Sequence, residues 1–450
     1  MNVLFIYSEF YITSKGAPDP RKPLLYPWEK QFGISYISSL LKQNGHKTDL
    51  LALTRESKKR VVDDFVGKFR PQLICVTAVY REYDFILKIS RYLKSRYPAI
   101  YLVIGGAHVT LNPTEALQGP FDAICIGEGE YPILELVTQL EKSKKPSGIR
   151  NLWIKHDRKV EKNSTRPFIE NLDILPFPDR QMWQKWIKYP EKKQVILAGR
   201  GCPFKCTFCC NHALRTVAKG SYTRMRSPDN ILKELKAVMR RYPKTESIGF
   251  EVESIDLNRR FVSELCLKLE NMNRRRKRPL MFGTNLKIEP HKDYDDLFRK
   301  LKRANFKSIS IGLESGSKRI RETVLRRYYS NRDILRAVRL AQKYQMKIRL
   351  NVMLGIPDEK LADVKKTFDC VKKIQPDQLQ IAFFAPYPGT ALFDLCKKRG
   401  LLKKNGDTKM ERHELFLNMS ESLRKKVDEE LKFFLCEFYG EKVSGTDQTA

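Results

Sequence analysis

The sequence has 450 residues, with 85 Lys and Arg against 52 Asp and Glu, so its formal net charge is +33. A chain of that length usually forms two or three domains. The positive charge favours an anionic partner, such as nucleic acid, an anionic membrane surface or a phosphorylated small molecule. A solvated basic surface would give the same net charge. No apolar run reaches the roughly 18–20 residues of a membrane helix, and the N-terminus lacks the features of a signal peptide. We therefore expect a cytoplasmic protein without a transmembrane segment, whose ten cysteines are mostly reduced.

Residues 1–140 alternate short β-branched runs with helical patterns. The strands are expected at "NVLFIY", "KTDLLAL", "PQLICVTAV", "AIYLVIGG" and "FDAICIG", with helices near 33–43, 58–69, 84–97 and 114–117. Continuous apolar strands that alternate with helices predict an α/β domain with a doubly wound, Rossmann-like parallel sheet covered on both faces. In such sheets ligands bind beyond the carboxyl ends of the strands.

Small residues stand at three of these strand ends. Thr77 ends one strand, "GGAHVT" (105–110) follows another, and "GEGE" (127–130) follows a third. Glycine lets a backbone approach a ligand closely and accepts positive φ. The pattern favours a flat or bulky ligand on this edge of the sheet, and tight strand–helix turns are the alternative explanation.

Three segments of this region, "GISYISSLLKQNGH", "IGGAHVTLNP" and "FDAICIGEGE", resemble the cobalamin-binding domain that precedes some radical S-adenosylmethionine (SAM) domains. The resemblance implies a cobalamin site at Thr77, Gly105, Gly106, His108, Gly127, Glu128 and Gly129. The D-x-H-x-x-G motif, whose His coordinates cobalt in many free-standing cobalamin domains, is missing, because Asp19 has neither His nor Gly at the required spacing. His108 is the candidate axial ligand by position, and a loop histidine near phosphate or amide groups is the alternative.

The composition changes after residue 140. "EKSKKPSG" is polar and "ENLDILPFPDRQMW" contains two prolines, which is typical of a linker with a short irregular segment. We therefore predict a cobalamin-binding domain at 1–140, a linker at 141–190, a barrel domain at 191–400 and a short helical extension at 401–450.

The stretch "GCPFKCTFCC" places Cys202, Cys206 and Cys209 in a C-x3-C-x2-C pattern that Cys210 follows directly. A structural zinc site needs four ligands, and His212 is the only nearby residue that could be the fourth. A thioredoxin-like C-x-x-C centre leaves Cys202 unexplained. A [4Fe–4S] cluster is usually held by four thiolates, so three would leave one iron open to bind another molecule.

This pattern, which follows the strand "KQVILAGRG" and has Phe208 before the third Cys, resembles the radical SAM superfamily. The resemblance implies that Cys202, Cys206 and Cys209 hold a [4Fe–4S] cluster, that the open iron chelates the amino and carboxylate groups of SAM, and that Cys210 is not a ligand. Six strands, "KQVILAG", "ESIGFEVESI", "PLMFGTNL", "FKSISIGLESG", "MKIRLNVMLGIP" and "QLQIAFFAPYPGT", match the partial (β/α)6 barrel of that family, in which chemistry takes place at the carboxyl strand ends.

The same resemblance implies a SAM site at Phe208, Glu253, Glu314, Ser315, Arg327 and Asn351. Glu253 departs from the family's usual Gly-Gly-Glu or Asp pair at this position. Arg327 suits bidentate binding of the SAM carboxylate, and a solvated helix end is the alternative. No catalytic residue is assigned.

Together the two resemblances imply a cobalamin-dependent radical SAM enzyme. Such an enzyme generates a 5′-deoxyadenosyl radical, and the leading hypothesis is a C-methyltransferase that acts on an unactivated carbon under anaerobic conditions. Radical cyclisation or rearrangement, as in porphyrin monomethyl ester cyclases, is the alternative, and an RNA-modifying protein is a third hypothesis, which the lack of an RNA-binding motif disfavours. The expected partners are a small-molecule substrate and an electron donor such as flavodoxin or ferredoxin. An anionic substrate would agree with the positive net charge.

Overall fold

The computed structural model describes residues 1–8, 30–54, 57–157, 159–187, 191–402 and 415–440, so Asp19 lies outside the described residues. The chain divides into two units. The first comprises Met1–Pro190 and Cys210–Arg226, and the second comprises Glu191–Cys209 and Ser227–Ala450.

The first unit is an α/β sheet structure. Its strands are β1 (Asn2–Ser8), β2 (Lys47–Leu53), β3 (Leu73–Thr77), β4 (Tyr101–Gly105), β5 (Ala123–Cys125), β6 (Leu152–His156), β7 (Lys159–Lys162) and β10 (Arg224–Met225). Its helices are α1 (Phe32–Gln43), α2 (Lys59–Phe69), α3 (Tyr80–Arg96), α4 (Ala107–Leu111), α5 (Pro113–Ala116), α6 (Glu130–Glu141), α7 (Asn211–Leu214) and the 3-10 turns η2 (Leu172–Ile174) and η3 (Gln181–Trp183).

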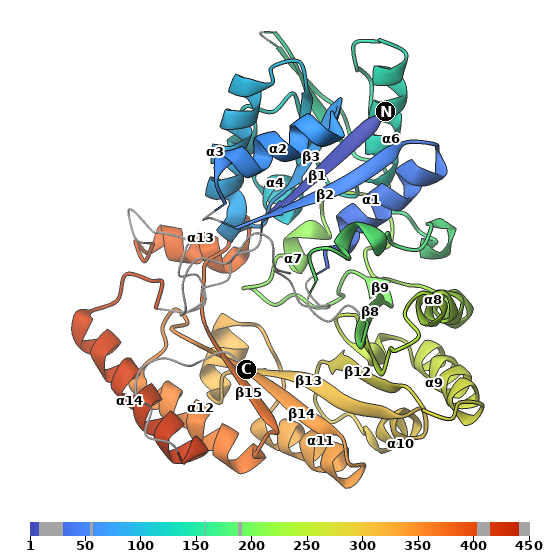
Figure 1. The fold of residues 1–450 in the computed structure, drawn as a ribbon. Helices are drawn as coiled ribbons and strands as arrows, with labels where there is room; N and C mark the ends of the chain where they lie inside the picture. The colour runs from blue at the N-terminus through green and yellow to red at the C-terminus, as the bar shows by residue number, and fades with distance from the viewer. Residues whose placement is uncertain (9–29, 55–56, 158, 188–190, 403–414, 441–450) are drawn as a thin grey trace. The chain divides into compact units, whose positions relative to one another are not determined.

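The main sheet of this unit has the strand order β2-β1-β3-β4-β5-β6-β7. The strands from β2 to β5 are parallel, whereas β6 and β7 are added antiparallel. Helices α1 and α6 pack together on one face, and α2 and α3 lie on the other (Figure 1), so the predicted doubly wound sheet is confirmed. The order reverses between β1 and β3, and ligands of such sheets bind at this switch point, beyond the carboxyl strand ends.

The segment predicted as a linker is partly built into this unit. It supplies β6 and β7, and its later part is anchored by two buried tryptophans. The indole N–H of Trp183 donates to Ser35 Oγ at 2.7 Å, and that of Trp186 donates to the Leu50 carbonyl at 2.9 Å. Asp179 accepts a hydrogen bond from Ser38 at 2.7 Å. These contacts were not predicted, because their partners are more than a hundred residues away in the sequence.

The second unit is built on a six-stranded parallel sheet. The strands of that sheet are β8 (Lys193–Leu197), β11 (Ser247–Glu251), β12 (Met281–Leu286), β13 (Phe306–Glu314), β14 (Lys347–Leu354) and β15 (Gln378–Phe383), and the unit also contains the short strand β9 (Gly199–Arg200) outside it. Its helices are α8 (Pro228–Arg241), α9 (Arg259–Arg274), α10 (Asp295–Arg303), α11 (Asn331–Lys343), α12 (Leu361–Ile374), α13 (Ala391–Lys398), α14 (Glu421–Tyr439), the 3-10 turn η4 (Ile255–Leu257) and the π-turn η5 (Ile320–Val324).

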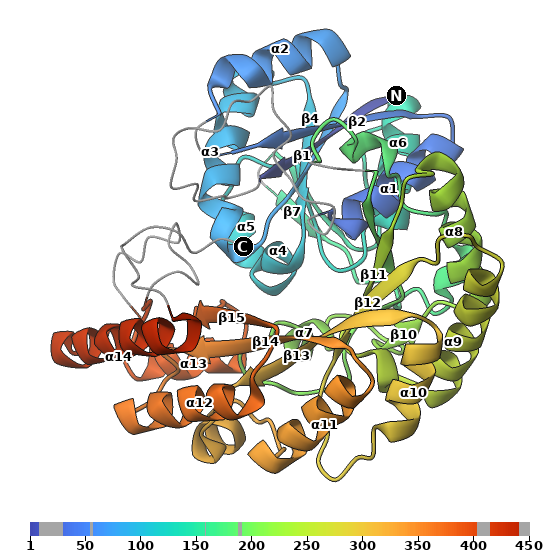
Figure 2. The same cartoon turned by 60° about the horizontal axis from the view of Figure 1, so that its bottom comes forward.

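The sheet runs in the order β15-β14-β13-β12-β11-β8, and all neighbours are parallel. These are the six strands of the predicted partial barrel. Helices α9 to α12 follow the outer face (Figure 2), where Phe250, Phe282 and Phe306 pack with ring centroids 5.4–5.8 Å apart. The predicted C-terminal helix, α14, packs on α12 through Phe434, which stacks on Phe368 at 4.2 Å.

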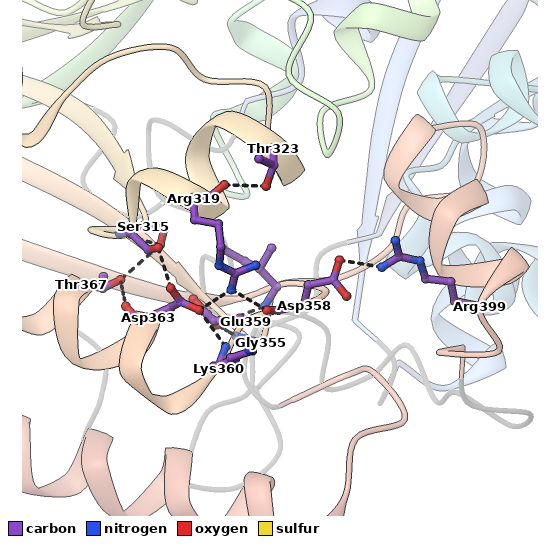
Figure 3. Close-up of polar contacts among 12 residues, drawn as sticks. Ser315, Arg319, Thr323, Gly355, Asp358, Glu359, Lys360, Asp363, Thr367 and Arg399 are labelled. Carbon is purple, nitrogen blue, oxygen red and sulfur yellow. Dashed lines mark hydrogen bonds and ion pairs between the residues drawn. The ribbon is translucent and has the colours of Figure 1, made fainter.

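A buried carboxyl group shapes the turn after β14 (Figure 3). Glu359 accepts hydrogen bonds from the backbone N–H of Gly355 at 2.7 Å and of Ile356 at 3.2 Å, both through Oε2. The residue is only 5% exposed, and its Oε1 has no hydrogen-bond partner among the described residues. Burial, opposed by the two N–H groups, raises the pKa of Glu359 to about 8.

We predict that Glu359→Gln stabilises the second unit increasingly as pH rises. The unfolded carboxyl group loses its proton near its ordinary pKa of 4.5, whereas the folded one keeps it to about pH 8. The folded state therefore binds more protons across this window, and wild-type stability should fall by up to about 1.4 kcal/mol for each pH unit. Glutamine accepts the same N–H groups without titrating. Denaturant unfolding from pH 5 to 9 would check this, with Glu429→Gln on the exposed surface of α14 as the control. Parallel pH profiles of Glu359→Gln and wild type would contradict it.

Candidate functional site

The three cysteines of the C-x3-C-x2-C pattern lie in the loop that follows β9. Cys202 and Cys206 are buried, Cys209 is half-buried, and none of the three is in a disulfide. Thr207, in the middle of the loop, donates its hydroxyl to the Val324 carbonyl at 2.5 Å, and its backbone carbonyl accepts the N–H of Leu392 at 3.0 Å. The loop is thus held between η5 and the start of α13.

A cation that sequence reasoning missed lies beside these thiols. Nζ of Lys287 is 3.5 Å from Sγ of Cys206 and 3.2 Å from the ring centroid of Phe204. Burial lowers the pKa of Lys287, and burial raises the pKa of the Cys202 thiol to about 11. Lys287 thus places a cation beside thiols whose deprotonated form binds iron. Its position directly after β12, at a carboxyl strand end, is the signal that could have identified it.

The chemistry of this loop fits an iron–sulfur cluster. Cubane clusters are bound by cysteine thiolates, and three cysteines outside disulfides share the loop beside a lysine. Among the described residues, no group of three or more His, Cys, Asp or Glu side chains converges as ligands of one metal ion. Three thiols that do not meet at a point are compatible with ligands of separate iron atoms.

Two of the residues assigned to SAM form a buried ion pair. Nη1 of Arg327 is 2.6 Å from Oε1 of Glu314, and Nη2 donates to the Gly312 carbonyl at 3.2 Å. Arg327 is 7% exposed, so it is not a solvated helix end. Burial by itself lowers the pKa of Arg327, but Tyr329 and Glu314 raise it overall, so the guanidinium stays charged. Glu314 has a φ of +59°, a conformation that residues other than glycine rarely adopt and that clusters at functional sites.

Ser315 lies in the next turn and is completely buried. Its hydroxyl accepts the N–H of Ser317 at 3.2 Å and lies 3.3 Å from the hydroxyl of Thr367 (Figure 3). A Cβ on Gly316 would lie 2.2 Å from the Lys366 carbonyl oxygen, so this turn needs glycine to fit against α12. Within the described structure, the Ser315 side chain thus stabilises the turn through hydrogen bonds to protein groups. Its contact with SAM stays a prediction.

A buried arginine supports this turn. Arg321, in η5, is fully buried and donates to the carbonyls of Ser315 at 2.5 Å and of Tyr329 at 3.2 Å. Sequence reasoning missed it, because an arginine in a helical pattern normally indicates a solvated position.

The other SAM candidates have different surroundings. Phe208 packs against the apolar cluster that includes Ile320. Asn351 donates its amide to Ser310 Oγ at 3.0 Å, across β13 and β14. Glu253 is exposed just beyond β11, and its charge adds to the effect of burial in raising the pKa of Cys202.

In the first unit, the glycines at the end of β4 have separate explanations. Gly106 has a φ of +106°, and a Cβ there would lie 2.7 Å from the Ala78 carbonyl oxygen, so the fold itself requires glycine. A Cβ on Gly105 would make an ordinary 3.4 Å contact with Cys125. Thr77 ends the neighbouring strand β3, in register with Gly105. Thr77 and Gly105 therefore give this edge a small-residue surface that would fit a bulky ligand.

The loop after β5 is held by its own contacts. Gly127 has a φ of +81° and donates its N–H to Thr110 at 3.1 Å. Glu128 pairs with the buried Arg224 at 3.0 Å and accepts the N–H of Ile169 at 2.8 Å. A Cβ on Gly129 would lie 3.0 Å from Ile37. The turn geometry thus accounts for Gly127, and packing accounts for Gly129.

His108 is enclosed by protein in α4. It is 4% exposed, and its ring centroid lies 4.4 Å from that of Tyr83. Nε2 lies 3.3 Å from Oε2 of Glu115, and Nδ1 lies 3.5 Å from the amide nitrogen of Asn112. Both ring nitrogens face other side chains, so these contacts would have to change before the ring could bind cobalt.

In the part of the chain that the structure describes, no helix is long and apolar enough to cross a membrane.

Two family models match segments of the chain. Residues 29–137 match the B12 binding domain, and residues 196–371 match the radical SAM superfamily.

Two known proteins are similar to this chain over most of its length. The chain is 25% identical over 374 residues to an uncharacterized methyltransferase of Pyrococcus horikoshii, covering 82% of this chain and 79% of that protein. It is 26% identical over 412 residues to the anaerobic magnesium-protoporphyrin IX monomethyl ester cyclase of Rubrivivax gelatinosus, and the alignment covers 87% of this chain and 69% of that protein.

Two solved structures share the fold. One is the radical SAM methyltransferase TsrM from Kitasatospora setae, with cobalamin and a [4Fe–4S] cluster bound, at a TM-score of 0.67 and 16% identity over 90% of this chain and 79% of that one. The other is the cobalamin-dependent radical SAM enzyme OxsB with aqua-cobalamin and SAM bound, at a TM-score of 0.70 and 16% identity over 98% and 67%. The two domain matches stand in the predicted order, so the chain is a radical SAM enzyme that carries an N-terminal B12-binding domain, and the cofactors of these domains are a [4Fe–4S] cluster, SAM and cobalamin.

Proposed function

We propose that the protein is a C-methyltransferase that acts on an unactivated carbon. The observation that carries this proposal is the presence of a B12-binding domain and a radical SAM domain in one chain, an arrangement whose relatives include a protein named as a methyltransferase. When bound, SAM and the cluster supply a reactive carbon radical, and cobalamin supplies a methyl donor. The protein contributes binding, orientation and charge.

The residues of the second unit have distinct proposed roles. Cys202, Cys206 and Cys209 hold the cluster, and the ammonium of Lys287 offsets part of its negative charge. Arg327, which is charged and buried, orients Glu314 toward the amino or ribose part of SAM. The buried Nε–H of Arg327 has no hydrogen-bond partner among the described residues, so it is available to a carboxylate.

Ring formation is the second candidate, because the Rubrivivax relative is a cyclase. The two reactions differ in mass, since methylation adds a methyl group whereas oxidative cyclisation removes hydrogen. The partners also stay proposals: a small-molecule substrate, an electron donor such as flavodoxin or ferredoxin, and a cytoplasmic location.

We expect that replacing Cys202, Cys206 or Cys209 singly by Ala abolishes the iron–sulfur absorption of anaerobically reconstituted protein and its cleavage of SAM, because each thiolate binds a separate iron. Cys210→Ala is the matched control and should keep both. Equal loss in Cys210→Ala would show that the ligand set is wrong.

Glu314→Gln should weaken SAM binding about 2- to 150-fold, which corresponds to a lost hydrogen bond of about 0.5–3 kcal/mol. Equilibrium dialysis with labelled SAM measures this, and iron content shows that the cluster site is intact. Glu322→Gln, on η5, is the control. Unaltered SAM affinity in Glu314→Gln would remove this residue from the proposed site.

The methyl-transfer proposal is tested with SAM whose methyl group is deuterated. Wild-type protein loaded with cobalamin should add the labelled methyl group to a compound in a small-molecule extract, detected by mass spectrometry. Gly105→Leu should lose cobalamin and methyl transfer yet keep its iron and form 5′-deoxyadenosine, because the leucine fills the small-residue edge beside Thr77. Gly105→Ala, whose Cβ makes only an ordinary contact, should behave as wild type. Product formation by wild type that carries no cobalamin would refute the proposal.

A further inference from the structure

The two faces of the second sheet have opposite character. On β14, Ile348 and Leu350 are buried toward the helices, whereas Arg349 between them is exposed. Strand residues alternate between faces, so the polar set belongs to the inner face. The inner positions of β12 to β15 are Met281, Gly283, Asn285, Ser308, Ser310, Gly312, Lys347, Arg349, Asn351, Met353, Gln378, Gln380 and Ala382.

This composition differs from that of a closed barrel. The interior of a (β/α)8 barrel is filled mainly by bulky branched residues, and here the middle of the inner face carries hydroxyl, amide and guanidinium groups. Ser308, Arg349, Gln378 and Gln380 are exposed. Polar groups so placed are available to hydrogen-bond a ligand.

Arg349 is the centre of this set. Its Nε donates to Oε1 of Gln378 at 3.1 Å, which fixes the plane of the guanidinium. No acidic side chain pairs with Arg349 or with Lys347 among the residues that the structure describes. The acid at the end of β13, Glu314, is already paired with Arg327. The inner face therefore presents a positive charge with its terminal N–H groups unused.

The register relates this charge to the SAM end of the sheet. Arg349 pairs with Ser310 and Gln378, and Asn351 pairs with Gly312 on β13. Arg349 is thus two residues, about 7 Å, before Asn351 along β14. A molecule of modest length could reach from Arg349 to the carboxyl strand ends.

We propose that the substrate is a small anion, and that Arg349, oriented by Gln378, binds its carboxylate or phosphate group on the inner face of the sheet. This proposal rests on the proposed function in one respect, namely that the substrate binds on the inner face of the sheet. Arginine binds both groups through paired N–H donors. An apolar substrate would instead desolvate Arg349 and the nearby amides without replacing their hydrogen bonds.

A second set of unpaired cations serves as a control. Arg332 and Arg339 are exposed on α11, on the outer side of the sheet, and have no acidic partner among the described residues. If general positive charge rather than the inner face attracts the substrate, Arg339→Gln should impair the reaction as much as Arg349→Gln.

The experiment uses the full chain, reconstituted with cluster and cobalamin, and a small-molecule extract separated by anion exchange. Each fraction is tested for its ability to accelerate 5′-deoxyadenosine formation, which reports substrate binding whether or not a methyl group is transferred. Acceleration should come from fractions retained at neutral pH, and phosphatase treatment then separates phosphates, which lose activity, from carboxylates, which keep it. Methyl label in the same fraction tests the proposed function separately.

With the active fraction, Arg349→Gln should raise the concentration needed for half-maximal acceleration by about 10- to 100-fold. Arg349→Lys keeps the charge without the paired donors, so its half-maximal concentration should lie between those of Arg349→Gln and wild type. Arg339→Gln should have the same half-maximal concentration as wild type. Iron content and SAM affinity report whether each variant is folded. Acceleration by neutral or cationic fractions only, acceleration by none, or an unaffected Arg349→Gln would each overturn the proposal.

Discussion

The buried ion pair between Glu314 and Arg327 is the interaction on which the second unit's candidate site depends. It joins the end of β13 to the segment after η5. The last residue of η5, Val324, accepts a hydrogen bond through its carbonyl from the hydroxyl of Thr207 in the cysteine loop. Removing one member of such a pair leaves an uncompensated buried charge, which typically costs about 3–5 kcal/mol. The cysteine loop, the Ser315 turn and the strand end are therefore connected through this pair.

The two units meet the need for small residues at strand ends in different ways. In the second unit, Gly316 is required because α12 approaches its backbone. In the first, Gly106 is required by the neighbouring Ala78 carbonyl, whereas Gly105 has room for a Cβ. Only the glycine that the fold does not itself require is informative about a ligand, so Gly105 carries more of the cobalamin argument than the other strand-end glycines.

The second sheet shows how one strand pattern serves two purposes. Its outward residues, such as Phe282 and Leu350, hold the helices, and burial of their apolar surface supplies stability. Its inward residues are free of that task and carry Arg349 and Gln378. Stability and substrate selection thus rest on alternate residues of the same strands, so inward substitutions should alter specificity more than folding.

Much of this protein was predictable from local patterns. The spacing of Cys202, Cys206 and Cys209 pointed to the cluster, and the alternation of apolar strands and helices predicted both sheets, because these signals lie within a few neighbouring residues. The antiparallel β6 and β7, the anchoring of Trp183 on Ser35, the Lys287–Cys206 contact and the enclosure of His108 by Tyr83 were decided only in three dimensions. Each depends on side chains from separate elements meeting at one point, and the direction and depth of a side chain are set by how the elements pack, which no short stretch of sequence specifies.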